Sequence, residues 1–339
     1  MNRLQRILDF LKREKLFRLL LVLFILIVFS TIGITVIEPK TKLPDALWWS
    51  IVTLTTVGYG DIAPTSLGGR IIGVIIMFFG IGILGLFTGT IASIFVERKL
   101  KENRGMSNFD FENHIIICEW NFRANGILKE LRSDLRMEIT PIILIAEIER
   151  KPVDDEYLYF IQGGVTEENL KRANFDKART VVILGDDRLD NYSRDAKVVL
   201  STLTVESINT DVYTIAELVD GKNLPHCQRA NADEIIVSSE FSTKLISRAT
   251  RDHGISKVLS ELLSSQFGND LYKVPVNGNM TGKKFIEVFS EMKREKDSTV
   301  LAIQKGANGD VISNPPMDHI IDEGDYLIVV SQVNPVKNS

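Results

Sequence analysis

Seven consecutive residues have the composition of a backbone binding site for a monovalent cation: Thr55, Thr56, Val57, Gly58, Tyr59, Gly60 and Asp61. Glycine takes left-handed backbone conformations without a steric penalty from Cβ, so Gly58 and Gly60 allow successive carbonyl groups to turn toward one axis. Four copies of the run around that axis would stack rings of carbonyl oxygens that replace the hydration shell of K⁺, and the Thr56 hydroxyl would add the innermost ring. The alternative interpretation is a tight turn in a soluble loop.

Aromatic side chains lie close to this run in the sequence. Tyr59 is expected to point away from the axis and to brace the carbonyl rings from behind. Trp48 and Trp49 belong to a short amphipathic stretch, residues 45–54, and are expected to pack near Tyr59 as an aromatic cuff. Tryptophan is also enriched at membrane–water interfaces, so an interfacial role alone is the alternative for both residues.

Two apolar segments flank the run and are long enough to cross a bilayer. Residues 19–37 are 19 residues without a charge, and residues 71–96 are 26 residues without a charge. A hydrocarbon core of about 30 Å needs roughly 20 helical residues at about 1.5 Å each. The pattern predicts a two-span pore unit over residues 19–97 that lies in the lipid bilayer.

The distribution of basic residues predicts the orientation in the membrane. Lysine and arginine are concentrated just before the first span and just after the second. By the positive-inside rule both termini are cytoplasmic and the seven-residue run faces outward. This predicts a multi-pass protein of the cell's inner (plasma) membrane. Residues 1–18, with apolar residues at helical spacing, are expected to form an amphipathic helix at the inner leaflet.

The second span is rich in glycine. Glycine weakens a helix by about 1 kcal/mol relative to alanine, so a cluster of glycines predicts a gating hinge or a segmented helix. The alternative is close packing against a neighbouring helix through small residues. The candidate hinge residues are Gly80, Gly82, Gly85 and Gly89.

The remainder of the chain has the opposite charge. Residues 1–105 carry 13 Lys/Arg against 7 Asp/Glu, and residues 106–339 carry 27 against 37. The acidic second part argues against a nucleic acid partner, because neutralising phosphates needs clustered lysine and arginine. Cys118 and Cys227 provide no disulfide framework, and each is expected to be a small buried residue.

From residue 114 onward, strands alternate with helices. The apolar run 114–118 is typical of a central parallel strand, and further strands are expected at residues 142–146, 158–162, 180–184, 212–216 and 234–237. Helical patterns between most of them predict a doubly wound, Rossmann-like sheet. A break at residues 252–254 predicts two crossing helices, and residues 271–330 predict a small α+β lobe.

The chain resembles prokaryotic two-transmembrane potassium channels with a cytosolic RCK domain, the regulator of K⁺ conductance. The resemblance rests on TTVGYGD (55–61), the inner-helix GIG (80–82), HIIIC (114–118), TIAE (214–217) and NADEIIVS (231–238). It implies an all-α pore with two transmembrane helices and a pore helix, followed by an RCK domain. The expected bounds are 19–97 for the pore, 98–113 for a linker, 114–240 for a Rossmann-like N-lobe, 241–267 for crossing helices that pair two domains, and 268–333 for a C-lobe.

The resemblance also implies an assembly. In that family residues matching Thr56 to Asp61 form the selectivity filter of a homotetramer, and eight RCK domains form a gating ring that pulls on the inner helices. This chain carries one RCK domain, so the remaining four would be additional soluble copies begun at an internal methionine such as Met106, or would come from a partner. Some relatives pair the filter aspartate with a pore-helix glutamate. The matching position here is Val52, so Asp61 needs another partner.

Two classes of gating ligand are expected from the soluble part. A nucleotide such as NAD or ADP would bind where the first strand ends, at Asn121 and Arg123, with Glu147 accepting hydrogen bonds from the ribose. The glycine fingerprint of dinucleotide sites is missing there, and Glu119 would repel a phosphate. The alternative for Glu147 is a surface carboxylate.

Calcium is the second candidate ligand. Oxygen-rich clusters suit Ca²⁺, and Asp186, Asp187 and Glu217 follow the fourth and fifth strands. In calcium-gated relatives an acid stands at the matching end of the fourth strand, where this chain has Gly185, and a second acid after the fifth strand is replaced by Val219. Solvated surface charge is the alternative for each of these acids.

The resulting prediction is a K⁺ channel opened or closed by a cytosolic ligand, and not an enzyme. A membrane-anchored, nucleotide-dependent oxidoreductase would need the glycine fingerprint and a catalytic constellation. A regulatory subunit of an ion transporter would not carry its own filter.

Overall fold

The computed structural model describes residues 16–266, 268–307 and 309–335, and the chain divides into two compact units between Glu102 and Asn103. The interfacial helix predicted over residues 1–18 falls mainly on residues 1–15, which lie outside the described residues. Residues 16–18 belong to the first described helix.

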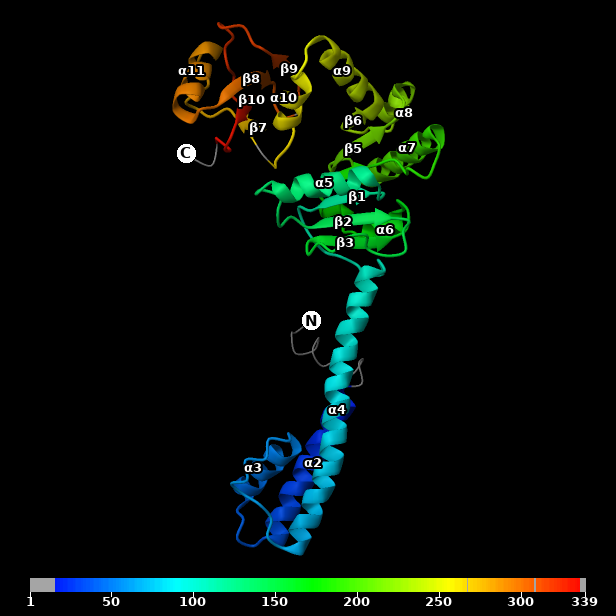
Figure 1. The fold of residues 1–339 in the computed structure, drawn as a ribbon, viewed down its shortest axis with the longest axis vertical. Coiled ribbons are helices and arrows are strands. Elements are labelled where there is room, and N and C mark those ends of the chain that lie inside the picture. The colour runs from blue at the N-terminus through cyan, green and yellow to red at the C-terminus, as the bar shows by residue number, and fades with distance from the viewer. Residues whose placement is uncertain (1–15, 267, 308, 336–339) are drawn as a thin grey trace. The chain divides into compact units, whose positions relative to one another are not determined.

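The described residues of the first unit form three helices, α2 (Leu16–Ile37), α3 (Leu43–Leu54) and α4 (Leu67–Asn103) (Figure 1). Among the described residues, α2 and α4 are the two helices long and apolar enough to cross a membrane, with mean hydropathies of 3.0 and 2.6. Pro44 opens α3, where its missing N–H is not needed. The short helix packs against the long ones through a core that includes Ile34, Trp49, Leu54 and Ile76.

The second unit begins with a six-stranded sheet. Its strand order is β3-β2-β1-β4-β5-β6, and all neighbouring strands are parallel. This is the doubly wound order with the chain reversing direction across the sheet between β1 and β4. The strands are β1 (Ile115–Cys118), β2 (Ile142–Ala146), β3 (Leu158–Gln162), β4 (Thr180–Ile183), β5 (Tyr213–Leu218) and β6 (Glu234–Val237).

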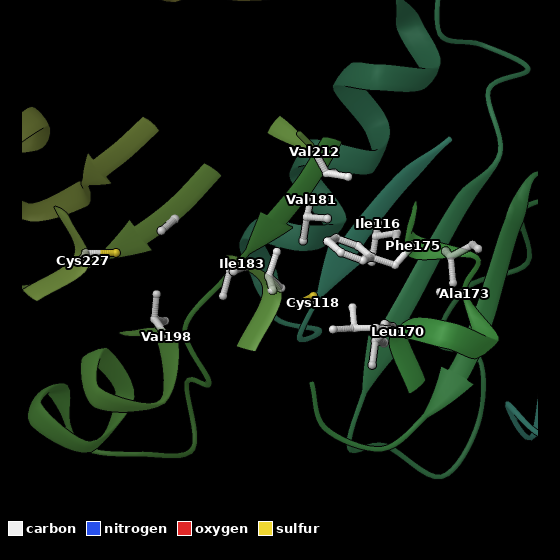
Figure 2. Close-up of a cluster of buried hydrophobic side chains, with 14 of the residues drawn as sticks. Ile116, Cys118, Leu170, Ala173, Phe175, Val181, Ile183, Val198, Val212 and Cys227 are labelled. Atoms are coloured by element: carbon white, nitrogen blue, oxygen red, sulfur yellow. The ribbon is translucent and has the colours of Figure 1, made fainter. Parts of the chain in front are cut away.

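Successive residues of these strands are buried on opposite faces. Ile115 and Ile117 pack with Leu128 of α5 (Phe122–Ser133) on one face. Ile116 and Cys118 pack on the other face, in the cluster that Figure 2 shows, against α6 (Glu167–Arg172), α7 (Asn191–Ile208) and α8 (Leu224–Arg229). Strands buried on both faces read as continuous apolar runs, which is why the sequence predicted them.

Both cysteines are free and buried, as predicted. Burial, with a smaller contribution from the charge of Glu119, raises the pKa of the Cys118 thiol to about 12. Both side chains therefore act as small apolar residues of the sheet core.

Crossing helices and a smaller lobe follow the parallel sheet. Helices α9 (Ser238–Arg251) and α10 (Ile255–Leu262) are separated at Gly254, whose φ of +94° favours glycine. The C-lobe is an antiparallel sheet in the order β7-β10-β8-β9 with α11 (Phe285–Lys296). Its strands are β7 (Asp270–Pro275), β8 (Thr299–Gln304), β9 (Val311–Ser313) and β10 (Tyr326–Ser331). The predicted fold class is confirmed, and β9 is an addition to the predicted strands.

Candidate filter and ligand-binding sites

The backbone of the predicted filter turns in a regular alternation. Thr56, Gly58 and Gly60 have φ angles of +64°, +57° and +75°, and Val57 and Tyr59 between them are outside the left-handed region. Alternating backbone handedness brings successive carbonyl groups to the same side of the chain, whereas in a β-strand they alternate. The amides of Val57 and Gly58 both donate to the Val52 carbonyl, at 3.0 and 3.3 Å, which holds the start of this segment against the end of α3.

Trp48 supplies the partner that Asp61 needs in place of a pore-helix glutamate. Its Nε1 donates to Asp61 Oδ2 at 2.9 Å. The Trp48 ring also stacks on Tyr59, with centroids 6.0 Å apart and planes 5° from parallel. Trp49 instead is buried in the core of the first unit, beside Gly73. Trp48 therefore contacts the predicted filter, whereas Trp49 is a core residue of the first unit.

A carboxylate joins the ends of the two long helices on the filter side. Glu38, just after α2, accepts hydrogen bonds from the Thr65 and Ser66 amides at 2.9 and 2.7 Å and from the Thr65 hydroxyl at 3.1 Å. Ser66 in turn accepts from the Gly69 amide in the first turn of α4. Glu38 thereby fixes the segment that leads from the filter into α4.

The four predicted hinge glycines lie in one uninterrupted helix, α4, and fall into two groups. A Cβ at Gly80 would lie 3.3 Å from Leu54 Cγ and 3.5 Å from Leu54 Cα, so this glycine allows α3 to approach closely. A Cβ at Gly82, Gly85 or Gly89 would meet no atom within 4 Å. Close packing within the chain thus explains the glycine at position 80. It does not explain the glycines at positions 82, 85 and 89.

At the carboxyl edge of the parallel sheet, Lys197 of α7 gathers three acids. Its Nζ donates to Glu119 and Glu147 at 2.9 Å each and to Asp186 at 3.1 Å. These acids follow β1, β2 and β4, and we call the four residues the Lys197 cluster. Arg188 also binds Asp186, at 2.8 Å, and its hydrogen bonds are the largest cause of an Asp186 pKa well below the ordinary carboxyl range. Asp186 therefore stays ionised at neutral pH.

A second charged group, the Arg123 cluster, lies around the same edge. Arg123 binds Asp187 and Glu217, each at 2.7 Å. Arg194 is 3.1 Å from Asp187 and 3.9 Å from Glu217, and only 13% of its side chain is exposed. The predicted metal candidates are thus divided between two clusters, with Asp186 in one and Asp187 and Glu217 in the other.

The first turn after β1 combines an unusual backbone with a structural asparagine. Glu119 has a φ of +78°, where a glycine is expected in a dinucleotide site, and its side chain is 8% exposed. Asn121 caps α5 by accepting from the Ala124 amide and donates to the Gly185 carbonyl at 2.7 Å. Both polar groups of the Asn121 side chain therefore hold the turn in place. These contacts give no support to the nucleotide-binding role predicted for Asn121 from the sequence.

Four residues of this edge were outside the set of site residues predicted from sequence: Glu119, Arg188, Arg194 and Lys197. Arg194 and Lys197 are three residues apart and so lie on one face of α7, which is the one sequence signal for them. Their partners lie up to 78 residues away in the chain, as for Lys197 and Glu119.

The segment that follows α4 is bound to the same edge of the sheet. The amide of Gln162, the last residue of β3, donates to the Gly105 carbonyl at 3.2 Å, and the Lys151 amide donates to the Asn103 carbonyl at 2.8 Å. Arg172 donates to the carbonyl groups of Gly105 and Ser107. We call these contacts the linker clamp.

Family models match almost the whole chain. A model described as "Ion channel" matches residues 19–97. A model of the "Calcium-activated potassium channel slowpoke-like RCK domain" matches residues 110–216, and one for "Castor and Pollux, part of voltage-gated ion channel" matches residues 239–338. The matches follow the division into a pore unit and a second unit.

Individual proteins agree with these models. The calcium-gated potassium channel TvoK of Thermoplasma volcanium is 32% identical over 85% of this chain and 81% of its own length. The putative potassium channel protein YugO of Bacillus subtilis is 28% identical over 91% and 94%. The gating ring of human SLO3 has the same fold, with a TM-score of 0.53 and 17% identity over 66% of this chain and 45% of that one. The chain belongs to the family of prokaryotic two-transmembrane potassium channels with a cytosolic RCK domain.

Proposed function

We propose that the chain forms a homotetrameric, K⁺-selective pore in the inner (plasma) membrane, with both termini cytoplasmic and K⁺ bound by the residues from Thr56 to Asp61. The observation that carries this proposal is the alternation of left-handed backbone at Thr56, Gly58 and Gly60. One chain supplies one row of carbonyl groups, and a filter needs four such rows around an axis. A cleft of about 590 Å³ between α3, the filter and α4 is the surface that a neighbouring copy would cover.

The bracing of this filter leads to a first prediction. Replacing Trp48 by phenylalanine keeps an aromatic ring beside Tyr59 but removes the donor to Asp61. A hydrogen bond to a charged group contributes about 1.5–3 kcal/mol, and a tetramer would lose four of them. We expect the K⁺ current of Trp48→Phe to decay at least tenfold faster during sustained activity, measured in reconstituted bilayers.

The matched control for this experiment is Trp49→Phe, which keeps an apolar ring in the core and removes no contact to the filter aspartate. A Trp48→Phe channel with wild-type decay would show that the hydrogen bond to Asp61 does not brace the filter.

Glu38 leads to a second prediction, which concerns pH. Hydrogen bonds from Ser66 and Thr65 lower the pKa of Glu38 from its ordinary value of 4.5. A carboxyl group with a lowered pKa in the folded state stabilises that state above the ordinary pKa, and the contribution is lost as the pH falls through the lowered one. We expect external acidification below pH 4.5 to reduce the thermal stability of the wild-type tetramer more than that of Glu38→Gln. Equal acid sensitivity in thermal melts would contradict the role of Glu38.

We further propose that eight RCK domains form the gating ring, four from the tetramer and four from soluble copies begun at an internal methionine such as Met106. Apolar side chains on the crossing helices support pairing with a second copy, because they are about half exposed or more in the single chain. They are Phe241, Ile246 and Val258 on the helices and Leu263 directly after α10. For the domains we propose the bounds predicted from the sequence, from the pore at 19–97 to the C-lobe at 268–333.

For the ligand we propose an adenine nucleotide such as ADP. Glu147 is exposed at the end of β2, where an acid accepts ribose hydroxyls in this fold, and Arg188 donates to the Glu147 carbonyl at 3.2 Å. The Arg188 side chain is 58% exposed and would bind a phosphate group. Because the carboxylate of Glu119 lies at the first turn, where it would repel a phosphate of either nucleotide, we assign the phosphate contact to Arg188.

The linker clamp offers a direct route from this ligand to the pore. Ala146, just before Glu147, pairs in register with Gln162, and Gln162 donates to Gly105. The loop after Glu147 also carries Lys151, whose amide donates to Asn103, the last residue of α4. A ligand that moves Glu147 would therefore move the segment attached to the inner helix. We propose Gly82, Gly85 and Gly89 as the hinge that responds, with Gly80 as a packing residue.

Calcium is the second candidate because TvoK is named as calcium-gated. The residues predicted from sequence do not fit it in this conformation. Cationic side chains already occupy both clusters, Lys197 and Arg188 in one and Arg123 and Arg194 in the other. No gating step is therefore assigned to Ca²⁺ at these acids.

The proposal is tested on the full-length protein in nanodiscs. Calorimetry with ADP should show binding that Glu147→Ala weakens at least tenfold, and ADP on the cytosolic side should change the open probability. The sign of that change depends on which ring state binds ADP more tightly. Absence of ADP binding would refute the proposal that a nucleotide is the ligand. It would not affect the pore assignment, which the current recordings test separately.

A further inference from the structure

Three carboxylates from three strand ends converge at the carboxyl edge of the N-lobe sheet. One oxygen each of Glu119, Glu147 and Asp186 lies within 4.8 Å of the others. Calcium binds oxygens at about 2.3–2.6 Å, so ligands on opposite sides of the ion are about 5 Å apart. By spacing and charge alone, these acids would suit a divalent cation.

A side chain of the same protein takes the position among them. The Lys197 ammonium has three N–H donors, and they bind Glu119 Oε2, Glu147 Oε2 and Asp186 Oδ2 at 2.9, 2.9 and 3.1 Å. An ion bound by the same oxygens would overlap Nζ. The acids therefore fit a divalent cation only when Lys197 is absent or displaced.

Burial and charge favour keeping the ammonium in place. The side chains of Glu119 and Asp186 are 8% and 6% exposed. Burial opposes the charge of Lys197, but hydrogen bonds to the three acids outweigh it and raise the Lys197 pKa above its ordinary value of 10.5. Arg188 contacts Asp186 at 2.8 Å and lies 3.7 Å from Glu119, so it contributes a second positive charge without taking the central position.

We infer that Lys197 is a built-in cation that replaces a divalent metal ion among Glu119, Glu147 and Asp186, and so determines that this cluster of the channel does not bind Ca²⁺. The argument is independent of the proposed nucleotide. It makes Lys197 a specificity-determining residue, since one substitution would expose three preorganised carboxylates to solvent cations.

Lys197→Met tests this inference, because methionine has a similar length and lacks the charge. The experiment is equilibrium binding of ⁴⁵Ca²⁺ to the full-length protein in nanodiscs, with thermal melts to verify folding. We expect Lys197→Met to bind one more Ca²⁺ per chain than the wild type, and the double variant Lys197→Met/Glu119→Gln to lose that gain. Lys197→Arg, which keeps the charge, and Lys171→Met, which removes an exposed lysine elsewhere, should both bind as the wild type does.

Two results would overturn the inference. A folded Lys197→Met protein that gains no Ca²⁺ would show that the lysine does not exclude the ion. Loss of a Ca²⁺ ion from Glu119→Gln in the wild-type background would show that the cluster binds the metal with Lys197 present. This second comparison holds even where Lys197→Met fails to fold. Neither result depends on whether ADP binds.

Discussion

Replacing Gly58 by alanine should abolish K⁺ current and leave the protein folded. Gly58 has a φ of +57°, in the left-handed region that costs an L-residue about 1–2 kcal/mol. A tetrameric filter would incur this cost four times, about 4–8 kcal/mol in total, and each 1.4 kcal/mol is a factor of ten in population. The population of the conducting filter conformation should therefore fall by roughly 700-fold or more. Fluorescence-monitored K⁺ flux into liposomes measures this loss.

A suitable control for this change is Gly282→Ala in the C-lobe. Gly282 also has a positive φ, +79°, and a Cβ there would meet nothing within 4 Å. It has comparable backbone strain outside the filter and should keep its K⁺ flux. Wild-type flux through Gly58→Ala would mean that the left-handed backbone at residue 58 is not required for conduction, and the filter assignment would lose its main support.

Replacing Gly105 by alanine should separate ligand binding from pore opening. Gly105 has a φ of +66°, and its Cβ would overlap the backbone nitrogen of Gln162 and lie 2.9 Å from the Ile161 carbonyl carbon. The linker would have to leave the end of β3, breaking the contact that joins it to the ligand edge. We expect ADP still to bind, with the change in open probability reduced at least tenfold.

The matched control for the linker clamp is Gly306→Ala, because Gly306 has nearly the same φ, +63°, and open space around its Cβ position. Calorimetry on the same preparations separates binding from coupling. If Gly105→Ala and Gly306→Ala both respond to ADP as the wild type does, the clamp does not transmit the signal, and another part of the second unit must reach the inner helix.

The predictable features of this chain were those encoded by neighbouring residues. The filter is a contiguous run whose glycines specify its backbone, and the spans are uncharged stretches of bilayer length. The central strands, such as 115–118, are continuous apolar runs because both faces are buried. The three-residue strand β9 has two of its three residues exposed, so it lacked such a signal.

The charged clusters could not be predicted because they depend on contacts between distant segments. Lys197 meets acids that are 78, 50 and 11 residues away, and nothing local to α7 indicates which of them it will reach. The Trp48 contact with Asp61 spans 13 residues and requires the filter to fold back beside α3. Asn121 was predicted to bind a nucleotide because of its position after β1. A helix cap at that position needs the same kind of polar residue as a ligand contact, so the sequence could not distinguish the two roles.

The central claim, a pore selective for K⁺, is tested most directly by the reversal potential of reconstituted single channels between KCl solutions of unequal concentration, with Na⁺ added to one side. The account predicts a reversal potential that follows the K⁺ gradient and does not shift when Na⁺ is added. A reversal potential near zero, or one that follows the Cl⁻ or Na⁺ gradient, would contradict it.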